Sequence, residues 1–343
     1  MKSARFPRYA LSGGVATALL VACGGSQSAV NPEPLGRRDV SAHASAERGC
    51  PTAHCIVVGD VAPGNADGSI LLFPRNGNGN IRPIGRIGGS LTGLHYVVGI
   101  AMDSDGNIYA ANWATDSITV YAAGSEGNVA PIRTIAGSQT ELHQPTGIAL
   151  DGDGDLFVVN SAGNSVTVYA PNSNGDARPV RVIRGNRTLL GGPWGIALDS
   201  SWKIYVTNGS SSSVTVYAAN AKGNAVPDQV ISGSLTQLNE PEGIVVDESG
   251  YVYVANWDSA SLVVFAPGAN GNEPPAREDS SALYGPDGVA VDERGRMYTA
   301  NGCQDDPAFV AVYAAGANDA GPLRIIAGKK TKLGSCATGI IVR

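Results

Sequence analysis

Charged side chains are scarce in this sequence of 343 residues, since Asp, Glu, Lys and Arg make up only 16%, well below the roughly 25% of ordinary soluble domains. Basic residues are outnumbered, with 24 Lys and Arg against 30 Asp and Glu. A clustered cationic footprint for nucleic acid is therefore disfavoured. Because 43% of the residues are hydrophobic, disorder driven by charge is excluded as well.

Histidine is rarer still, and the sequence contains none after residue 143. The four histidines are His43, His54, His95 and His143. The sequence also lacks a Gly-x-Ser-x-Gly nucleophile elbow and a phosphate-binding glycine loop. We therefore find no complete catalytic constellation in the sequence.

Glycine, in contrast, is abundant: it accounts for 45 of the 343 residues, about twice average usage. A helical protein is excluded by this count, because each interior glycine costs a helix about 1 kcal/mol.

The first residues resemble a bacterial lipoprotein signal. A positive start is followed by an apolar stretch over residues 10–22, too short to span a membrane comfortably, and then by Cys23-Gly24-Gly25. The resemblance implies a signal peptide over 1–22 and a lipid on Cys23; an ordinary secretory signal is the alternative. No other run of 18 apolar residues occurs.

Residues 23–54 are rich in Ser, Pro, Gly and Ala without any period. This composition is typical of a flexible tether. We expect the protein to be exported and either lipid-anchored to the cell envelope, at the outer membrane or cell surface, or secreted.

From residue 55 onward the chain repeats. A Gly-apolar-small-apolar-Asp string recurs at intervals of 45 to 48 residues, and a sixth copy ends the chain; the glycines are Gly99, Gly147, Gly195, Gly243, Gly288 and Gly339. Thirteen residues after each of the first five stands an asparagine: Asn112, Asn160, Asn208, Asn256 and Asn301. A period of this length, built of short strands, is typical of a β-propeller blade.

One unit contains four predicted strands, A to D, over residues 147–150, 156–159, 165–170 and 178–183. The domain starts at residue 55 with a B strand and ends at 339–342 with an A strand. The last strand therefore supplies the one that the first blade lacks and closes the ring without an open edge. We predict an all-β, six-bladed propeller over 55–343, with four antiparallel strands per blade, as a monomer.

The repeated motifs Pro-x-Gly-Ile-Ala-Leu-Asp, Gly-x-Ile-Tyr-Val-x-Asn and Ser-Val-Thr-Val-Tyr resemble NHL-repeat propellers and their secreted bacterial relatives. The resemblance covers essentially residues 55–343. It implies the fold more than the chemistry, because such propellers include lactonase-like hydrolases, amidating lyases and non-enzymatic binders. The scarcity of histidine disfavours the amidating and streptogramin lyases.

One mouth of the channel collects the candidate functional residues, because strand A begins where strand B ends. The residues before the glycines are Val98, Thr146, Trp194, Glu242, Asp287 and Thr338, and the B strands end at Asp60 and the five repeat asparagines. Trp113 and Trp257 follow two of these asparagines. The tryptophans could stack on a ligand or pack the rim. The asparagines could contact a ligand, but a cap on the B–C turn is favoured because they recur in every repeat.

A metal site is the alternative use of this mouth. Carboxylate and amide oxygens suit Ca²⁺ or another divalent cation, and the gluconolactonase-like propellers resemble this arrangement in using Glu, Asn and Asp there. The corresponding residues would be Glu242, Asp287, Asn256 and Asn301. Solvated rim charges are the other explanation.

Four cysteines remain once Cys23 is assigned to the lipid, and export favours disulfides between them. Cys303 and Cys336 are expected on one face of adjacent blades. We pair Cys303 with Cys336, and Cys50 with Cys55.

Two functions follow from the sequence. The first is a non-enzymatic, surface-tethered module, without a cofactor, that binds a protein, a glycan or a small molecule at the channel mouth. The alternative is a metal-dependent lactonase or related hydrolase.

Overall fold

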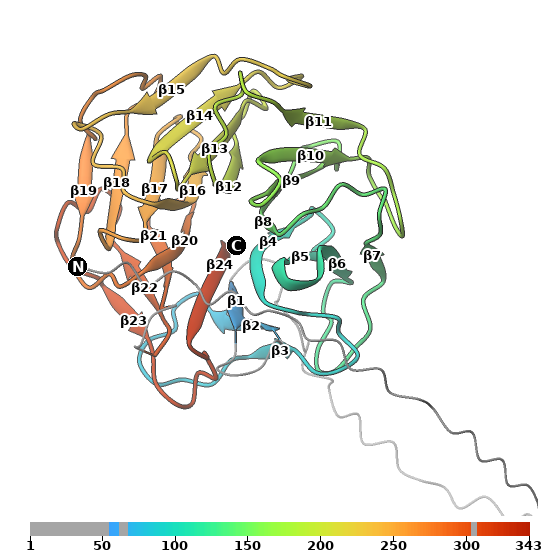
Figure 1. Ribbon diagram of the computed structural model, residues 1–343. Helices are drawn as coiled ribbons and strands as arrows, with labels where there is room; N and C mark the ends of the chain where they lie inside the picture. Colours follow the sequence, from blue (N-terminus) through green and yellow to red (C-terminus); the bar gives the residue numbers. More distant parts are fainter. Residues whose placement is uncertain (1–54, 62–67, 303–306) are drawn as a thin grey trace, which may run out of the picture. The chain divides into compact units, whose positions relative to one another are not determined.

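Six four-stranded antiparallel sheets surround a central channel in the computed structural model, which describes residues 55–61, 68–302 and 307–343 (Figure 1). The predicted all-β propeller of six blades is confirmed. The signal-peptide and tether predictions, 1–22 and 23–54, lie outside the described residues. Within the described part, no helix has the length and apolar character needed to cross a membrane.

Each blade consists of four strands that follow one another from the channel outward. Blade 1 consists of β24 (Cys336–Val342), β1 (Cys55–Val61), β2 (Gly68–Pro74) and β3 (Gly85–Ile87). Blade 2 consists of β4 (Val97–Met102), β5 (Ile108–Asn112), β6 (Ser117–Tyr121) and β7 (Arg133–Ile135), and blade 3 of β8 (Pro145–Leu150), β9 (Leu156–Asn160), β10 (Ser165–Tyr169) and β11 (Arg181–Arg184). A short 3-10 helix, η1 (Trp113–Thr115), follows β5.

The remaining three blades follow the same order. Blade 4 consists of β12 (Pro193–Leu198), β13 (Ile204–Asn208), β14 (Ser213–Tyr217) and β15 (Gln229–Ser232). Blade 5 consists of β16 (Pro241–Val246), β17 (Val252–Asn256), β18 (Ser261–Phe265) and β19 (Arg277–Asp279), and blade 6 of β20 (Pro286–Val291), β21 (Met297–Asn301), β22 (Phe309–Tyr313) and β23 (Arg324–Ile326).

The ring closes where the two ends of the described chain meet in one sheet. Strand β24 pairs antiparallel with β1, and Ile340 lies opposite Val58 (Figure 1). The predicted closure is thus confirmed, although β24 starts three residues earlier than expected. Its pairing covers the edge of β1 that would otherwise be open.

The hydrophobic core lies between the blades, because both faces of each sheet are covered by neighbours. One cluster, for example, joins Tyr109 and Val120 of blade 2 to Ile148 and Val158 of blade 3. This two-sided burial explains why the B and C strands are apolar at nearly every position and why little room is left for charge.

Glycine at the repeat position of each inner strand allows neighbouring blades to touch. A Cβ added to any of the six would lie 2.8 Å or less from a backbone atom of the next inner strand; the six are Gly99, Gly147, Gly195, Gly243, Gly288 and Gly339. We call them the glycine collar. Glycine is needed at these positions because it allows the backbones of neighbouring inner strands to approach closely.

The closing strand also constrains the cysteine pairing. Cys336 lies opposite Val61, whereas Cys55 pairs with Arg343 at the other end of the ladder. At about 3.3 Å per residue, these two cysteines are too far apart to bond to each other. Gly302, which precedes Cys303, bridges to Cys336. Cys50 and Cys303 lie outside the described residues, so both proposed disulfides stay predictions.

Candidate functional site

A β-bulge in each inner strand turns one side chain toward the channel mouth. In blade 4, the pairing advances from Pro193 opposite Asn208 to Ile196 opposite Val206, so three residues of β12 match two of β13. The bulge contains Trp194 and Gly195. Bulges of this kind re-aim side chains. The other inner strands show a comparable register shift.

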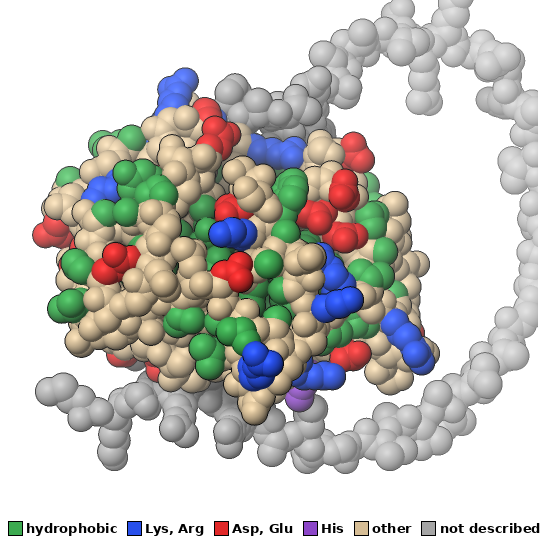
Figure 2. Space-filling view, turned by 90° about the horizontal axis from the view of Figure 1, so that it is seen from above, with side chains coloured by type: hydrophobic (Ala, Val, Ile, Leu, Met, Phe, Trp, Pro, Cys, Tyr) green, Lys and Arg blue, Asp and Glu red, His purple; other side chains and the backbone are tan. Residues whose placement is uncertain are grey.

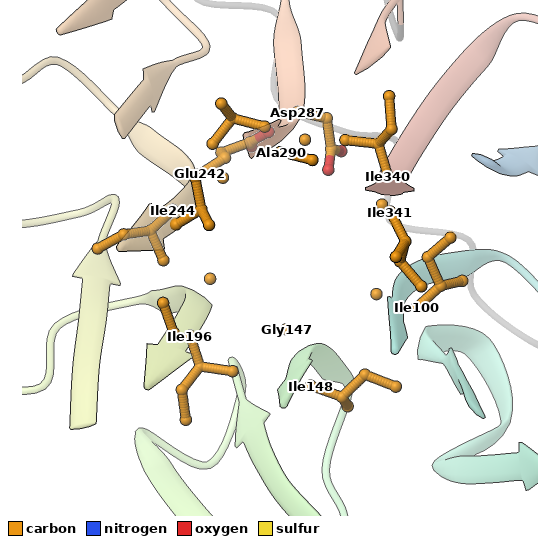
Figure 3. A pocket seen from close by; sticks show the side chains of 18 of the residues that line it. Ile100, Gly147, Ile148, Ile196, Glu242, Ile244, Asp287, Ala290, Ile340 and Ile341 are labelled. Atoms are coloured by element: carbon orange, nitrogen blue, oxygen red, sulfur yellow. The ribbon is translucent and has the colours of Figure 1, made fainter. Parts of the chain in front are cut away.

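The channel has an apolar wall and one acidic side. Its cavity of ≈ 330 Å³ is bordered by the residues after the collar glycines: Ile100, Ile148, Ile196, Ile244, Val289 and Ile340. Glu242 and Asp287, from blades 5 and 6, lie along one arc of this wall (Figure 3). The acidic side therefore occupies equivalent positions on adjacent blades.

These two carboxyl groups are buried, with 7% and 6% of their residues exposed. Burial, together with the charges of Asp287 and then Glu240, raises the pKa of Glu242 well above its usual range. Burial also raises the pKa of Asp287 to about 7, although a hydrogen bond from the Trp194 side chain acts in the opposite sense. Near neutral pH the pair therefore retains protons that exposed carboxyl groups would have lost.

The backbone of Trp194 is held in place by a hydrogen bond from the neighbouring blade. Thr146 on blade 3 donates a hydrogen bond of 2.7 Å to the Trp194 carbonyl oxygen. Thr207 donates similarly to the carbonyl oxygen of Glu242, at 2.6 Å. The mouth positions of blades 4 and 5 are thus anchored, and together with Asp287 of blade 6 they present an indole and two carboxyl groups to one side of the channel.

Tyr96 faces the acidic side from blade 2. It packs on Trp113 with ring centroids 5.3 Å apart, and its backbone has a φ of 52°. Its pKa is raised to about 12, first by burial and then by the negative charges of Asp287 and Glu242. Tyr96 therefore lies within electrostatic reach of residues that are far from it in the sequence.

Tyr96 was missed by the sequence reasoning. It occupies the third position before a collar glycine, where other blades carry Gln144, Gly192, Glu240 and Gly285. A bulky aromatic residue at a position that adopts positive φ is unusual. Alignment of the repeats at this position would have singled it out.

The acid pair predicts a pH-dependent stability. For a carboxyl group whose pKa is raised by folding, the stabilising contribution is complete below the unfolded pKa and is lost as pH rises through the folded value. For Asp287 this window runs from about 4 to about 7. We expect the Glu242→Gln, Asp287→Asn double variant to exceed wild type in unfolding free energy at pH 8 by about 4 kcal/mol, because the pKa of Asp287 is raised from 3.8 to about 7, at ~1.4 kcal/mol per pKa unit.

Urea unfolding at pH 5 and pH 8 measures this difference. Asp60→Asn is the comparison variant, because Asp60 is another buried carboxyl group whose pKa is raised by burial, to about 6, and it lies on β1 of blade 1, outside the acid pair. Equal pH slopes in wild type and the double variant would contradict the prediction.

The five repeat asparagines are buried inside their blades. Each has 0% of its surface exposed, and none borders the channel. Four of them accept a hydrogen bond from a backbone N–H of the loop that enters the inner strand: Asn112, Asn160, Asn208 and Asn256. The contacts support an architectural role. The amide oxygen caps the D–A loop, which was not expected, and in blades 2 and 6 the Nδ2 group also donates across the expected B–C turn, to the carbonyl oxygens of Ser117 and Phe309.

Replacing Asn160 with Ala tests this architectural role. Its Oδ1 accepts from His143 N at 3.0 Å, and its Nδ2 donates to Thr167 Oγ1 at 3.0 Å. Loss of both bonds in a buried place should cost about 2–3 kcal/mol, measured by urea unfolding. Ser161→Ala, which removes one partly buried hydroxyl, should cost less than half as much; equal losses would contradict the role.

The predicted metal set does not come together in the structure. Asn256 Oδ1 accepts from Asn239 N at 3.1 Å, and Asn301 donates to Thr299, so both amides face the blade interior. Only Glu242 and Asp287 of this set border the channel. Among the described residues, no three His, Cys, Asp or Glu side chains are grouped closely enough to hold a metal ion.

The three tryptophans predicted to form an aromatic platform do not all border the channel. Of the three tryptophans proposed for it, Trp194 borders the channel, and Trp113 packs on Tyr96. Trp257 lies against blade 6, with its Nε1 3.2 Å from the place where a Cβ of Gly285 would be. Trp257 therefore packs the rim.

Comparisons with known proteins show the fold. No protein-family model matches the sequence, and no curated protein matches it. A Bacteroides caccae protein of unknown function aligns with a TM-score of 0.61 and 11% identity, over 84% of this chain and 98% of its own. A chain of a nidogen/laminin complex aligns with a TM-score of 0.58 and 17% identity, over 84% and 97%.

A third structure is described as a candidate 6-phosphogluconolactonase of Bacteroides fragilis. It aligns with a TM-score of 0.52 and 13% identity, over 76% of this chain and 78% of its own. The chain is thus similar in fold to these three structures. At these identities the similarity shows the fold alone, so the function has to be argued from the residues of the site.

Proposed function

We propose that this propeller is a non-enzymatic binding module that takes a small ligand at the mouth of its central channel. The observation that carries the proposal is the convergence of Trp194, Glu242 and Asp287 from three adjacent blades on one side of an apolar cavity. A pocket with an apolar wall and a few converging polar groups is the usual form of a small-molecule site.

Matched tryptophan variants test the proposal. A chemically mixed set of sugars, lactones, amino acids and amines is screened by thermal shift and native mass spectrometry. Trp194→Ala should abolish the hits, whereas Trp202→Ala, an exposed tryptophan outside the channel, should keep them. Hits that survive Trp194→Ala, or a screen without hits, would overturn the proposal.

The hydrolase alternative is supported less well. A site of the gluconolactonase type would need Asn256 and Asn301 in the channel, and both are used inside their blades. Metal analysis of the purified protein and lactone hydrolysis with added Ca²⁺ or Zn²⁺ separate the two functions. If the wild-type protein contains metal or hydrolyses lactones, and the Glu242→Gln, Asp287→Asn variant does not, the protein is an enzyme and the proposal of a binding module is wrong.

We also propose that the module is exported and lipid-anchored through Cys23, which lies outside the described residues. Cells grown with a palmitate analogue should label the wild-type protein, and Cys23→Ser should lose the label. Retention of label in Cys23→Ser would refute the anchor, while Cys55→Ser serves as a cysteine control that keeps the lipid.

A further inference from the structure

Lysine is concentrated at one place in the ring. The sequence contains six lysines, and three of them stand in the loop that joins β23 to β24: Lys329, Lys330 and Lys332. The loop between β2 and β3 lies alongside, because Gly79 bridges in parallel to Ile326 of β23, and this loop contributes Arg82. Four exposed cations from distant parts of the sequence thus meet where blade 6 adjoins blade 1, which we call the closing junction (Figure 1).

The four cations border the same hollow. Its volume is ≈ 390 Å³, and it is lined by Arg82, Pro83, Lys329, Lys330 and Lys332. No acidic side chain of the described residues lines this hollow, and none of the ion pairs formed within the described ranges includes the four cations. A concave surface that is bordered by charge of one sign concentrates ions of the opposite sign.

The lysines occupy loop positions that the repeat does not reserve for them. The architectural residue of this loop is a threonine: Thr331 Oγ1 donates to the Gly328 carbonyl oxygen at 2.7 Å, and the equivalent threonine of blade 2, Thr140, makes the same kind of bond. The three lysines flank Thr331, whereas the same positions around Thr140 hold Ser138, Gln139 and Glu141. The fold therefore requires the threonine and not the lysines.

The junction of blades 2 and 3 has the same backbone contact as the closing junction. There, Gln139 N donates to Asp176 Oδ1 at 2.7 Å, and at the closing junction Lys330 N donates to Asn80 Oδ1, also at 2.7 Å. The repeat thus places Lys330 where blade 2 has Gln139. The cap at the closing junction is a neutral amide instead of a carboxylate, so it supplies no negative charge to the lysine loop.

Side chains at the equivalent positions of blades 2 and 3 come within hydrogen-bond distance of each other. Arg178 occupies the position in blade 3 that Arg82 occupies in blade 1, and its Nε donates to Gln139 Oε1 at 2.7 Å. At the closing junction the same contact would bring a guanidinium group to the ammonium group of Lys330, and like charges repel. A local conflict that the fold does not require is expected at functional sites. An anion between Arg82 and Lys330 would remove it.

A phosphate group is the anion that matches this set of donors. A guanidinium group forms two parallel hydrogen bonds with phosphate oxygens, and ammonium groups act as additional point charges. A phosphate monoester carries a charge of about −1.5 to −2 at neutral pH, whereas a carboxylate offers a single charge to the four cations. The hollow also has room for the organic part of a phosphorylated molecule.

Nucleic acid fits less well, because it binds along an extended track of cations. On the surface shown in Figure 2, which views the ring from the side of β15, acidic and basic side chains are mixed. The concentration of cations at the closing junction is therefore not shared by that surface.

We propose that the hollow at the closing junction binds a phosphate group, carried by a soluble small molecule or by a lipid headgroup, between Arg82 and the three lysines of the loop. None of the described residues that line this hollow borders the channel, so the inference is independent of the function proposed for the channel mouth. Because the cations are exposed, affinity should fall by on the order of tenfold between low salt and about 0.15 M salt.

Calorimetry with inorganic pyrophosphate tests the site in the whole protein at pH 8 and low ionic strength. Wild-type protein should bind pyrophosphate at one site. The Lys329→Gln, Lys330→Gln, Lys332→Gln triple variant should bind it at least about tenfold more weakly, because each exposed ion pair contributes a factor of up to about five. Arg82→Gln should weaken binding by about threefold.

Arg178→Gln is the matched control, because Arg178 holds the same repeat position beside an uncharged partner. It should bind pyrophosphate as tightly as wild type does. All of the substituted residues are exposed, so the melting temperatures of the variants without pyrophosphate should stay close to that of wild type.

Vesicles separate the two sources of phosphate. Cys23→Ser protein, which lacks the proposed lipid, is sedimented with phosphatidylcholine vesicles that do or do not contain phosphatidic acid. Binding to the acidic vesicles without binding of pyrophosphate would assign the site to a lipid headgroup. Binding of pyrophosphate without a preference for the acidic vesicles would assign it to a soluble phosphorylated molecule.

Two results would overturn the inference. One is the absence of both pyrophosphate binding and a preference for phosphatidic acid. The other is binding that persists undiminished in the triple lysine variant, or that falls equally in Arg178→Gln, because it would show only a general attraction between anions and the protein surface.

Discussion

Deletion of residues 339–343 should lower the melting temperature of the whole domain by about 10 °C or more. The deletion removes Gly339 from the collar and three of the β24 residues that pair with β1, among them Ile340 opposite Val58. Burial of a large aliphatic side chain contributes about 1.5–3 kcal/mol, so loss of Ile340, Ile341 and Val342 should cost about 5 kcal/mol, at ~2 °C per kcal/mol for a domain of this size.

Calorimetry of the deletion and of Arg343→Ala checks this expectation. The substitution keeps the backbone bonds between Arg343 and Cys55, so it should shift the melting temperature far less. The deletion variant should still unfold in a single thermal transition, because blade 1 packs against its neighbours on both sides as part of one ring. An unchanged melting temperature after deletion would mean that β24 does not close the ring.

Gly195→Ala should destabilise the propeller by about 3 kcal/mol or more. The new Cβ would collide with the carbonyl oxygen of Glu242 on the next inner strand. This contact is backbone against backbone, so no side chain can move aside, and overpacking of this kind costs about 1–3 kcal/mol or more. The spacing of blades 4 and 5 would have to widen.

Gly85→Ala provides the matched control. A Cβ at Gly85 would lie 3.6 Å from Leu72, an ordinary contact, and the corresponding residue of blade 2 is Arg133. Urea unfolding should therefore show a change within about 0.5 kcal/mol for Gly85→Ala. If both substitutions have the same small effect, the collar does not set the spacing of the blades.

The repeat pattern predicts the inner three strands of each blade well and the outer strand poorly. Strand β9 ends one residue beyond its predicted bound, whereas only the last three residues of the outer strand predicted over 178–183 belong to β11 (Arg181–Arg184). The outer strands depend on contacts with the next blade, such as the parallel bridge of Ile87 to Gly127. Local sequence carries no sign of such contacts.

The candidate site was predicted in part. Trp194, Glu242 and Asp287 are recognisable because they break the repeat, and antiparallel connection places them at one mouth. The asparagine contacts could not be derived in the same way, and neither could the proximity of Tyr96 to the acid pair. Asn160 bonds a loop residue 17 positions earlier, and Tyr96 meets the acid pair across the ring, so both depend on the tertiary structure.

In the six inner strands, the positions that determine the fold differ from those that could bind a ligand. At each position of the glycine collar, backbone atoms of the neighbouring inner strand lie where a Cβ would be, so the fold depends on the absence of a side chain there. The residue just before a collar glycine contributes its carbonyl to such a contact, whereas the side chains of Val98, Trp194 and Glu242 are not fixed by the repeat. New specificity can therefore be introduced at these positions without redesign of the scaffold, but not at Thr146 and Thr338, whose hydroxyl groups donate hydrogen bonds to the neighbouring inner strand.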